Sequence, residues 1–222
     1  MPLATAIFCD FDGTISRRDV GYHMFHHFSG GKNETLLPAW KSLQMSSREC
    51  LSAEAAMVEG SREDILAYVE SFEIDPGFVA FEHLCRQNGT PLLVVSDGLD
   101  FYINAVLGRH GLGHLPVMCN VGEFHGRGIQ IRFPWNNRSC TRCGNCKGER
   151  MAEYRATNPD KPSRLVFVGD GYSDICAVTQ SDFLLAKKDL ARYCAERRIA
   201  HIPFADFFEV ADILVRHGYL DR

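Results

Sequence analysis

Two carboxylates, Asp10 and Asp12, stand two residues apart in the run Asp-Phe-Asp-Gly-Thr at residues 10–14. Residues at this spacing on an extended backbone point the same way, so both carboxylates can converge on one site while Phe11 turns into the core. Adjacent carboxylates repel each other, and keeping both ionised requires a compensating cation. The spacing predicts a cation-assisted site. The simpler alternative is a pair of solvated aspartates in a loop whose Thr14 caps a helix.

Three further polar residues occur at comparable points of the chain. Ser96 and Asp170 each follow an apolar run, and Lys147 precedes the second of these runs. In open α/β sheets, ligands bind at the carboxyl ends of the strands. Taken alone, Lys147 fits a solvated helix residue. Together, the ordered set is hard to explain by capping, and it predicts a site shared with Asp10.

The elements that must position these residues form an α/β pattern. Residues 4–9, 91–95 and 165–168 are nearly continuous apolar runs that end in polar turns, which suits parallel strands buried on both faces. A helical pattern follows each, and strand, turn and helix form the unit of an α/β sheet. Further strands are predicted at residues 183–186 and 200–202, and a closing helix at residues 207–217.

About 80 residues separate the first two strands, far more than a simple crossover needs. The insert has a helical pattern with two segments that resemble capping boxes. We therefore predict an α/β fold in which residues 1–15 and 87–222 form a Rossmann-like parallel sheet core and residues 16–86 form an inserted helical cap. Loose alternation over residues 116–134 predicts a small β-hairpin.

Composition and charge exclude several classes of partner. The chain is 45% hydrophobic with a formal net charge of -4 and no run of Lys or Arg, so nucleic acid is not expected as a partner. Apolar stretches fall short of the roughly 20 residues that cross a bilayer, so no membrane association is expected. No basic leader is apparent and the nine cysteines are scattered, which predicts reduced thiols and a cytoplasmic location. The sequence does not indicate an oligomeric state.

On these motifs the chain resembles the haloacid dehalogenase-like superfamily over essentially all 222 residues. The four motifs of that superfamily are matched in order by residues 10–14, Ser96, Lys147 and residues 169–174, which read Gly-Asp-Gly-Tyr-Ser-Asp. The position of the insert is similar to the helical cap of the phosphoserine phosphatase-like branch. The resemblance implies a Mg2+-dependent phosphatase that acts on a small phosphorylated metabolite.

Carried over residue by residue, the resemblance implies that Asp10 is the nucleophile, which forms an aspartyl phosphate. It implies that Asp12 is first the general acid and then the base that activates water. Lys147 would neutralise the charge of the phosphate and the nucleophile. The implied Mg2+ ligands are oxygens of four residues: the Asp10 carboxylate, the Asp12 backbone carbonyl, Asp170, and Asp174, which would complete or orient the set.

Substrate contacts are implied at the second motif and in the insert. Ser96 and the backbone at Asp97 and Gly98 would hold the phosphoryl oxygens. Asp19 stands where phosphoserine phosphatases carry an acidic residue that meets the substrate amine, and Arg48 could read a carboxylate. The alternative is that both are surface charges on helices.

Within the superfamily, three segments look like the branch that acts on the methylthiopentenyl enol phosphate of methionine salvage. They are Cys119-Asn120, the run Cys-Gly-Asn-Cys-Lys at residues 143–147, and the run Phe-Ala-Asp-Phe-Phe at residues 204–208. The chain departs from that branch at Asp97, where a second glycine beside Gly98 is expected, and at Gly148, which replaces an expected proline. These departures bear on the substrate more than on the reaction, so a phosphoserine phosphatase-like or other small-metabolite phosphatase is the alternative.

One other feature and two other functions are alternatives to this interpretation. Cys140, Cys143 and Cys146 are spaced by three and could present thiolates to zinc or an iron–sulfur cluster, but a fourth ligand is not obvious and a plain cysteine-rich loop is the simpler interpretation. A phosphomutase would have to shield the aspartyl phosphate from water, whereas a base such as Asp12 favours hydrolysis. A non-catalytic metal-binding protein would be expected to have lost a motif residue, and none is missing.

Overall fold

The computed structural model describes residues 4–158 and 163–222 of the chain. One sheet runs through it, and its strands are β1 (Ala4–Cys9), β2 (Leu92–Leu99), β3 (Val117–His125), β4 (Gly128–Arg132), β5 (Ser163–Gly169), β6 (Phe183–Ala186) and β7 (Ile202–Pro203). Their order across the sheet is β4-β3-β2-β1-β5-β6-β7. Only the β3–β4 pair is antiparallel among these described strands. The predicted α/β fold with a parallel core sheet and a hairpin is confirmed.

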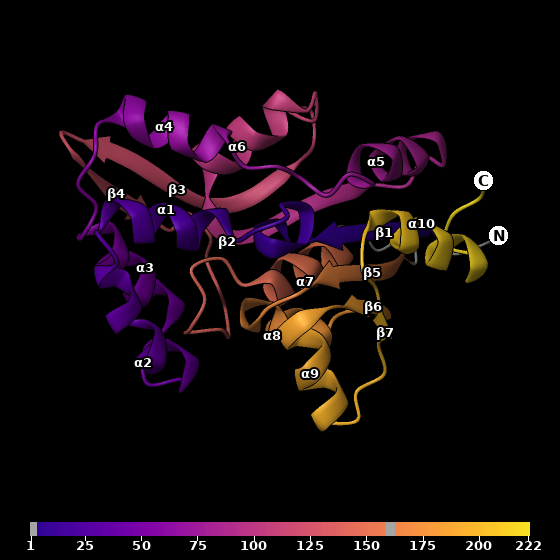
Figure 1. The fold of residues 1–222 in the computed structure, drawn as a ribbon. Coiled ribbons are helices and arrows are strands. Elements are labelled where there is room, and N and C mark those ends of the chain that lie inside the picture. Colours follow the sequence, from indigo (N-terminus) through magenta and orange to yellow (C-terminus); the bar gives the residue numbers. More distant parts are fainter. Residues whose placement is uncertain (1–3, 159–162) are drawn as a thin grey trace.

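Helices cover both faces of this sheet. They are α1 (Val20–Phe28), α2 (Leu37–Lys41), α3 (Ser47–Ala55), α4 (Arg62–Glu70), α5 (Phe78–Gln87), α6 (Asp100–Arg109), α7 (Lys147–Thr157), α8 (Ile175–Val178), α9 (Lys188–Glu196) and α10 (Phe207–Arg216). Helices α5, α6 and α10 lie on one face, and α7, α8 and α9 lie on the other (Figure 1). Among the described residues, no helix is both long enough and apolar enough to cross a membrane.

Strand β1 is the centre of the core because it pairs in parallel with both β2 and β5. Side chains alternate along it: Ile7 and Cys9 join the hydrophobic cluster of one face, and Ala6 and Phe8 join the cluster of the other. All four are at most 1% exposed, as predicted for a strand buried on both faces. The carboxyl ends of β1, β2 and β5 therefore meet at one edge of the sheet.

Three strands differ in detail from the prediction. Strand β2 does not stop at Val95 but continues to Leu99, because a register irregularity lets Leu99 pair with Asn120. The strand predicted at residues 200–202 is a two-residue pairing of β7 with β6. The predicted hairpin forms with β3 and β4, and β3 also joins the core sheet beside β2, which the alternation alone did not predict.

The insert between β1 and β2 contains helices α1 to α4, in magenta and indigo at the left of Figure 1. The predicted capping box forms at Ser46, whose hydroxyl accepts from the Glu49 amide at 3.2 Å while the Glu49 carboxylate accepts from the Ser46 amide at 2.8 Å. The Gly60 amide donates to the carbonyl of Arg127 at 2.9 Å, so the insert contacts the hairpin. The cap boundaries at residues 16 and 86 stay a prediction.

Helix α5 connects the insert to the core. It begins at Phe78. The Asp75 carboxylate accepts from the amides of Gly77 at 2.9 Å and Phe207 at 3.1 Å and so joins α5 to α10. The rings of Phe78 and Phe207 pack at 4.7 Å, and Gly89 ends the connection with φ +60°. Helix α5 thus returns the chain to β2.

Candidate active site

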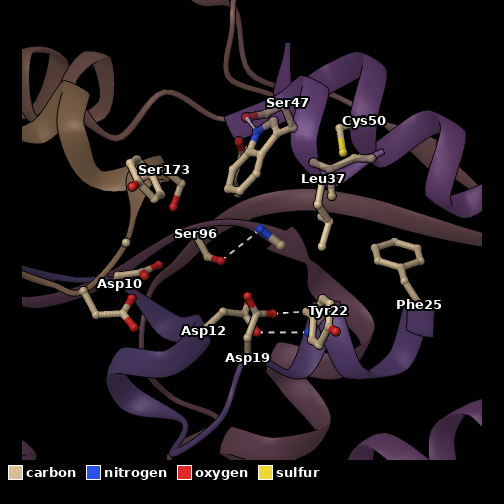
Figure 2. Close-up of a pocket in the computed structure, with 18 of the residues that line it drawn as sticks. Asp10, Asp12, Asp19, Tyr22, Phe25, Leu37, Ser47, Cys50, Ser96 and Ser173 are labelled. Carbon is tan, nitrogen blue, oxygen red and sulfur yellow. Dashed lines mark hydrogen bonds between the residues drawn. The ribbon is translucent and has the colours of Figure 1, made fainter. Parts of the chain in front are cut away.

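A cavity of about 480 Å³ lies between the carboxyl ends of the strands and helices α1 to α3. Its size is in the range of small-molecule sites. Figure 2 shows acidic and polar side chains at one end and apolar side chains of the insert at the other. The polar end includes Asp10, Asp12 and Ser96, and the apolar end includes Phe25, Leu37 and Cys50 (Figure 2). Asp170, Trp40 and Leu51 also line the cavity.

Lys147 lies against the carboxylate of Asp10. Its Nζ donates to Asp10 Oδ1 at 2.6 Å and to Ser173 Oγ at 3.1 Å, and it also donates to Asp174 Oδ1. The lysine is 1% exposed and the two aspartates at most 3%. Burial by itself lowers the pKa of Lys147, but the two carboxylates outweigh it and raise that pKa. The lysine is therefore a fixed buried cation.

Asp10 directly follows β1, and its Oδ1 also accepts from the Phe11 amide at 2.7 Å. Burial and the nearby charge of Asp174 raise its pKa, while Lys147 lowers it. One ammonium faces several carboxylates here, so the site has an excess of negative charge. A second cation would relieve that excess.

Asp170 and Asp174 follow β5 in the loop that leads to α8. Asp174 Oδ2 accepts from the amides of Asp170 at 2.8 Å and Gly171 at 2.9 Å, so this carboxylate shapes the loop. One carboxylate oxygen each from Asp10, Asp170 and Asp174 lie within 4.8 Å of one another. Such hard oxygen donors fit Mg2+. Because Asp174 is already bound by two amides and Lys147, it fits the orienting role better than direct ligation.

Asp12 turns away from these carboxylates. Its Oδ1 accepts from the amides of Val20 at 2.8 Å and Gly21 at 3.2 Å, and its Oδ2 accepts from the Tyr102 hydroxyl at 2.8 Å. Burial, with a smaller effect of the Asp19 charge, raises the pKa of Asp12 to about 7. A carboxyl with this pKa can both donate and accept a proton near neutral pH.

Gly98 provides the room that Asp12 and Tyr102 need. A Cβ at this position would lie 1.9 Å from the Tyr102 hydroxyl and 2.7 Å from Asp12 Oδ2. Next to it, Ser96 Oγ accepts from the Gly98 amide at 2.9 Å and lines the cavity (Figure 2). The Ser96 hydroxyl can therefore still donate its own hydrogen to a ligand at the polar end of the cavity.

The Asp97 side chain makes a different set of contacts. Its Oδ1 accepts from the Asn145 amide at 2.7 Å and from Asn120 Nδ2 at 3.0 Å, while Asn145 Nδ2 donates to the carbonyl of Ser96 at 3.0 Å. Burial raises the pKa of Asp97, and these hydrogen bonds offset part of the rise. Asp97 therefore ties the end of β2 to the segment that precedes Lys147, although it also borders the cavity.

Lys188 was not predicted as a site residue. Its Nζ donates to Asp170 Oδ2 at 2.8 Å and to the carbonyl of Gly13 at 2.9 Å. Gly13 has φ +75°, and a Cβ there would lie 2.5 Å from Asp170 Oδ2. The signal that could have found Lys188 is its position two residues after β6, at the same edge of the sheet as the other motifs.

The insert contributes Asp19, which was predicted, and Glu54, which like Lys188 was not predicted. Asp19 caps α1 by accepting from the Tyr22 amide at 2.7 Å and lies beside Asp12 in the cavity (Figure 2). Glu54 is 6% exposed, and its carboxyl accepts from Asn33 Nδ2 at 3.2 Å. Burial raises its pKa to about 7.

Arg48 does not line the cavity. Its guanidinium donates to the carbonyls of Cys143 and Trp135, both at 3.4 Å, and lies 4.9 Å from the centre of the Phe133 ring. The carboxylate-reading role suggested for it is therefore wrong, because the guanidinium joins the insert to the loop before α7 instead.

The sequence profile of the haloacid dehalogenase-like hydrolase family matches residues 7–178. The chain is 32% identical over 212 residues to the 2-hydroxy-3-keto-5-methylthiopentenyl-1-phosphate phosphatase of Brevibacillus brevis, and the match covers 94% of each protein. A protein of the same name from Geobacillus kaustophilus is 29% identical over 215 residues, with 95% of each covered.

Solved structures share the fold at low sequence identity. A HAD family hydrolase from Salmonella enterica serovar Typhi superposes with a TM-score of 0.75 at 16% identity, over 96% of this chain and 71% of that one. A phosphoserine phosphatase from T. onnurineus superposes with a TM-score of 0.69 at 18% identity, over 96% of this chain and 94% of that one. With its motifs at one sheet edge and its profile match over residues 7–178, the chain belongs to the haloacid dehalogenase-like hydrolase family.

Proposed function

We propose that the protein hydrolyses a small phosphate monoester through a phospho-aspartyl intermediate on Asp10. The observation that carries this proposal is the pairing of Asp10 with the buried Lys147 at 2.6 Å, close to a second carboxyl, Asp12, whose pKa is raised to about 7. In the first step an Asp10 oxygen attacks phosphorus, the bond to the leaving oxygen breaks, and Asp12 gives that oxygen its proton. In the second step Asp12 takes a proton from water, which attacks phosphorus and releases phosphate and the free Asp10.

The remaining polar groups stabilise the transferred phosphoryl group. Lys147 neutralises its charge, and the Ser96 hydroxyl donates to one of its oxygens. A Mg2+ ion would be held by the Asp10 and Asp170 carboxylates and the Asp12 carbonyl, with Asp174 orienting the loop. When bound, Mg2+ supplies positive charge to the phosphoryl oxygens. Because Asp12, with its pKa raised to about 7, can act as a base toward water, hydrolysis is a better fit than phosphoryl return in a mutase.

For the substrate, we propose the enol phosphate that the curated relatives are named for, 2-hydroxy-3-keto-5-methylthiopentenyl-1-phosphate. Its leaving group carries an apolar methylthio end. The cavity end farthest from Asp10 is apolar, with Phe25, Leu37 and Cys50 among its side chains (Figure 2). The near-neutral Glu54 lies at the same end and can hydrogen-bond an oxygen of the leaving group.

Phosphoserine is the second candidate, because Asp19 could pair with its ammonium group. The carboxylate of phosphoserine needs a cation as well. No arginine is among the described residues that line the cavity, and of its two lysines Lys188 is paired with Asp170 while Lys41 is exposed. This lining favours the apolar leaving group. We also propose a cytoplasmic location, which suits a chain whose nine cysteines form no disulfide among the described residues.

The test is phosphate release with Mg2+ from the enol phosphate, from the same compound without its methylthio group, and from phosphoserine. Leu37→Ala should lower kcat/KM about 10-fold for the complete enol phosphate and leave the truncated compound nearly unchanged, because a contact worth roughly 1.4 kcal/mol is lost. Leu43→Ala is the matched control, since Leu43 is 65% exposed on the same insert. A higher kcat/KM for phosphoserine, or equal effects of the two leucine variants, would refute the substrate assignment.

A further inference from the structure

Four cysteines gather behind the active site. Cys140, Cys143 and Cys146 come from the loop that precedes α7, and Cys176 comes from α8, some thirty residues farther along the chain. All four sulfur atoms lie within 4.8 Å of one another, and the Sγ atoms of Cys143 and Cys176 are 3.9 Å apart. All four are free thiols, and none lines the cavity. The loop thus gains the fourth ligand that was not obvious in the sequence.

We propose that these four cysteines bind one Zn2+ ion in a tetrahedral structural site. Zinc binds thiolate sulfur at about 2.3 Å, so the sulfurs at the corners of such a tetrahedron stand roughly 3.8 Å apart. The distance between Cys143 and Cys176 matches that spacing. In a cluster of two or four irons the thiolates bind different iron atoms and stand farther apart, which this compact group does not fit. The thiols release their protons to solvent when the ion binds.

The site would fasten together two loops of the active site. Cys146 directly precedes Lys147 and is the N-cap of α7, while Cys176 follows Asp174 by two residues. Because Lys147 donates to Asp174, one ion would fix both partners of that ion pair from behind. None of the four thiols touches Asp10, so the ion acts by positioning Lys147 and takes no part in the chemistry.

Gly148 supports the close approach of the two segments. A Cβ at this position would lie 2.2 Å from the carbonyl oxygen of Cys176 and 3.5 Å from its Cβ. Any larger residue would push α7 away from α8 and separate the sulfurs. The loop is also held by the Ser139 amide, which donates to Glu149 at 2.8 Å, and by Asn137, whose side chain donates to the carbonyl of Cys143 at 2.9 Å. A variant that lacks one thiol therefore keeps these other restraints.

The experiment measures zinc and iron per chain in protein purified under reducing conditions without added chelator. We expect one equivalent of zinc in the wild type, about a tenth of that or less in Cys176→Ser and Cys140→Ser, and one equivalent in Cys194→Ala. Cys194 is the matched control because it is a buried thiol in α9 outside the group. Metal content is measured without substrate, so this result is independent of the proposed phosphatase activity.

A second measurement uses only the wild type, in case a serine variant does not fold. Titration of the native protein with an organomercurial should release one zinc per chain as the thiols react, followed with a chromogenic zinc chelator. Three outcomes would overturn the proposal: no zinc after reconstitution of the reduced protein, one equivalent of iron in its place, or full zinc retained in Cys176→Ser. Loss of two free thiols without bound zinc would indicate a Cys143–Cys176 disulfide and would also overturn it.

Discussion

Replacing Lys147 by methionine should lower the free energy of unfolding by about 3–5 kcal/mol in Mg2+-free buffer at neutral pH. Methionine fills a similar volume, so the change removes the ammonium without opening a large cavity. Asp10 and Asp174 would then be buried carboxylates without their cation. At an effective dielectric constant near 20, a unit-charge pair at the Lys147–Asp10 distance attracts by roughly 6 kcal/mol, and the expected net value is smaller because burial costs part of it.

The same change at Lys188 is the matched control. Lys188 also pairs with an aspartate, Asp170, at 2.8 Å, but its side chain is 53% exposed. Solvent screens such a pair, so Lys188→Met should change the unfolding free energy by about 1 kcal/mol or less. A second change, Asp174→Asn, in the Lys147→Met background should restore part of the loss, because it removes one of the two unpaired charges.

Urea unfolding followed by circular dichroism measures these differences, and the melting temperature of Lys147→Met should fall by on the order of 10 °C. The pH dependence is a further readout. Without Lys147, the already raised pKa of Asp10 rises further. For an acid with a raised folded pKa, the loss of stability grows as pH rises from the unfolded to the folded pKa and is complete above the folded pKa. The variant should therefore regain stability as pH falls and Asp10 takes up a proton. A loss below about 1 kcal/mol, equal to that of Lys188→Met, would refute the buried ion-pair reasoning.

Four further predictions concern catalysis. Asp10→Asn should lower kcat by at least ~10³-fold in phosphate-release assays, and Asp12→Asn should lower it nearly as much. Each change removes a group that takes part in bond making or proton transfer. Near-normal turnover in either variant would contradict the mechanism. Because the pKa of Asp12 is raised to about 7 and the first step needs its proton, kcat/KM should fall as pH rises above that value, and a profile that climbs steadily through pH 8 would argue against Asp12 as the acid. Chelation of divalent metal with EDTA should abolish turnover and added Mg2+ should restore it; activity that persists after chelation would exclude the metal. Gly98→Ala should lower the free energy of unfolding by about 1–3 kcal/mol and remove most of the activity, because the new Cβ would displace Tyr102. An unchanged melting curve would contradict this prediction and would show that the turn can relax.

The polar end of the site was predictable because its residues sit at fixed points of a repeated unit. A parallel strand that is buried on both faces ends in a turn at one sheet edge, so Asp10, Ser96 and Asp170 had to meet there once the strands were recognised. Lys188 follows the same rule after β6, but its strand is only four residues long and gave a weak signal. Their catalytic and metal-binding roles stay predictions for the variants above to test.

The contacts of the insert could not be predicted in the same way. Helical periodicity shows that one face is buried, but it does not distinguish a face that packs on the core from one that lines a cavity. Glu54 illustrates this: in the sequence it is one more acid on a polar helix, yet it is buried beside Asn33 with a pKa near 7. Arg48 shows the converse, because its charge suggested a ligand and its contacts are two backbone carbonyls.

In the sequence alone, the two departures from the methionine-salvage pattern, Asp97 and Gly148, bear on the identity of the substrate more than on the reaction. Their contacts give another explanation. The Asp97 carboxylate accepts from Asn145 and Asn120, and Gly148 leaves room for the carbonyl of Cys176. Both therefore act on the segment that delivers Lys147: Asp97 accepts from the Asn145 amide, and Gly148 lies in close contact with α8. Asp97 borders the cavity, but the apolar end is built from α1, α2 and α3, so neither departure is one of the apolar side chains that would bind the leaving group. The substrate proposal therefore depends on the named relatives and on the apolar side chains that the insert places in the cavity.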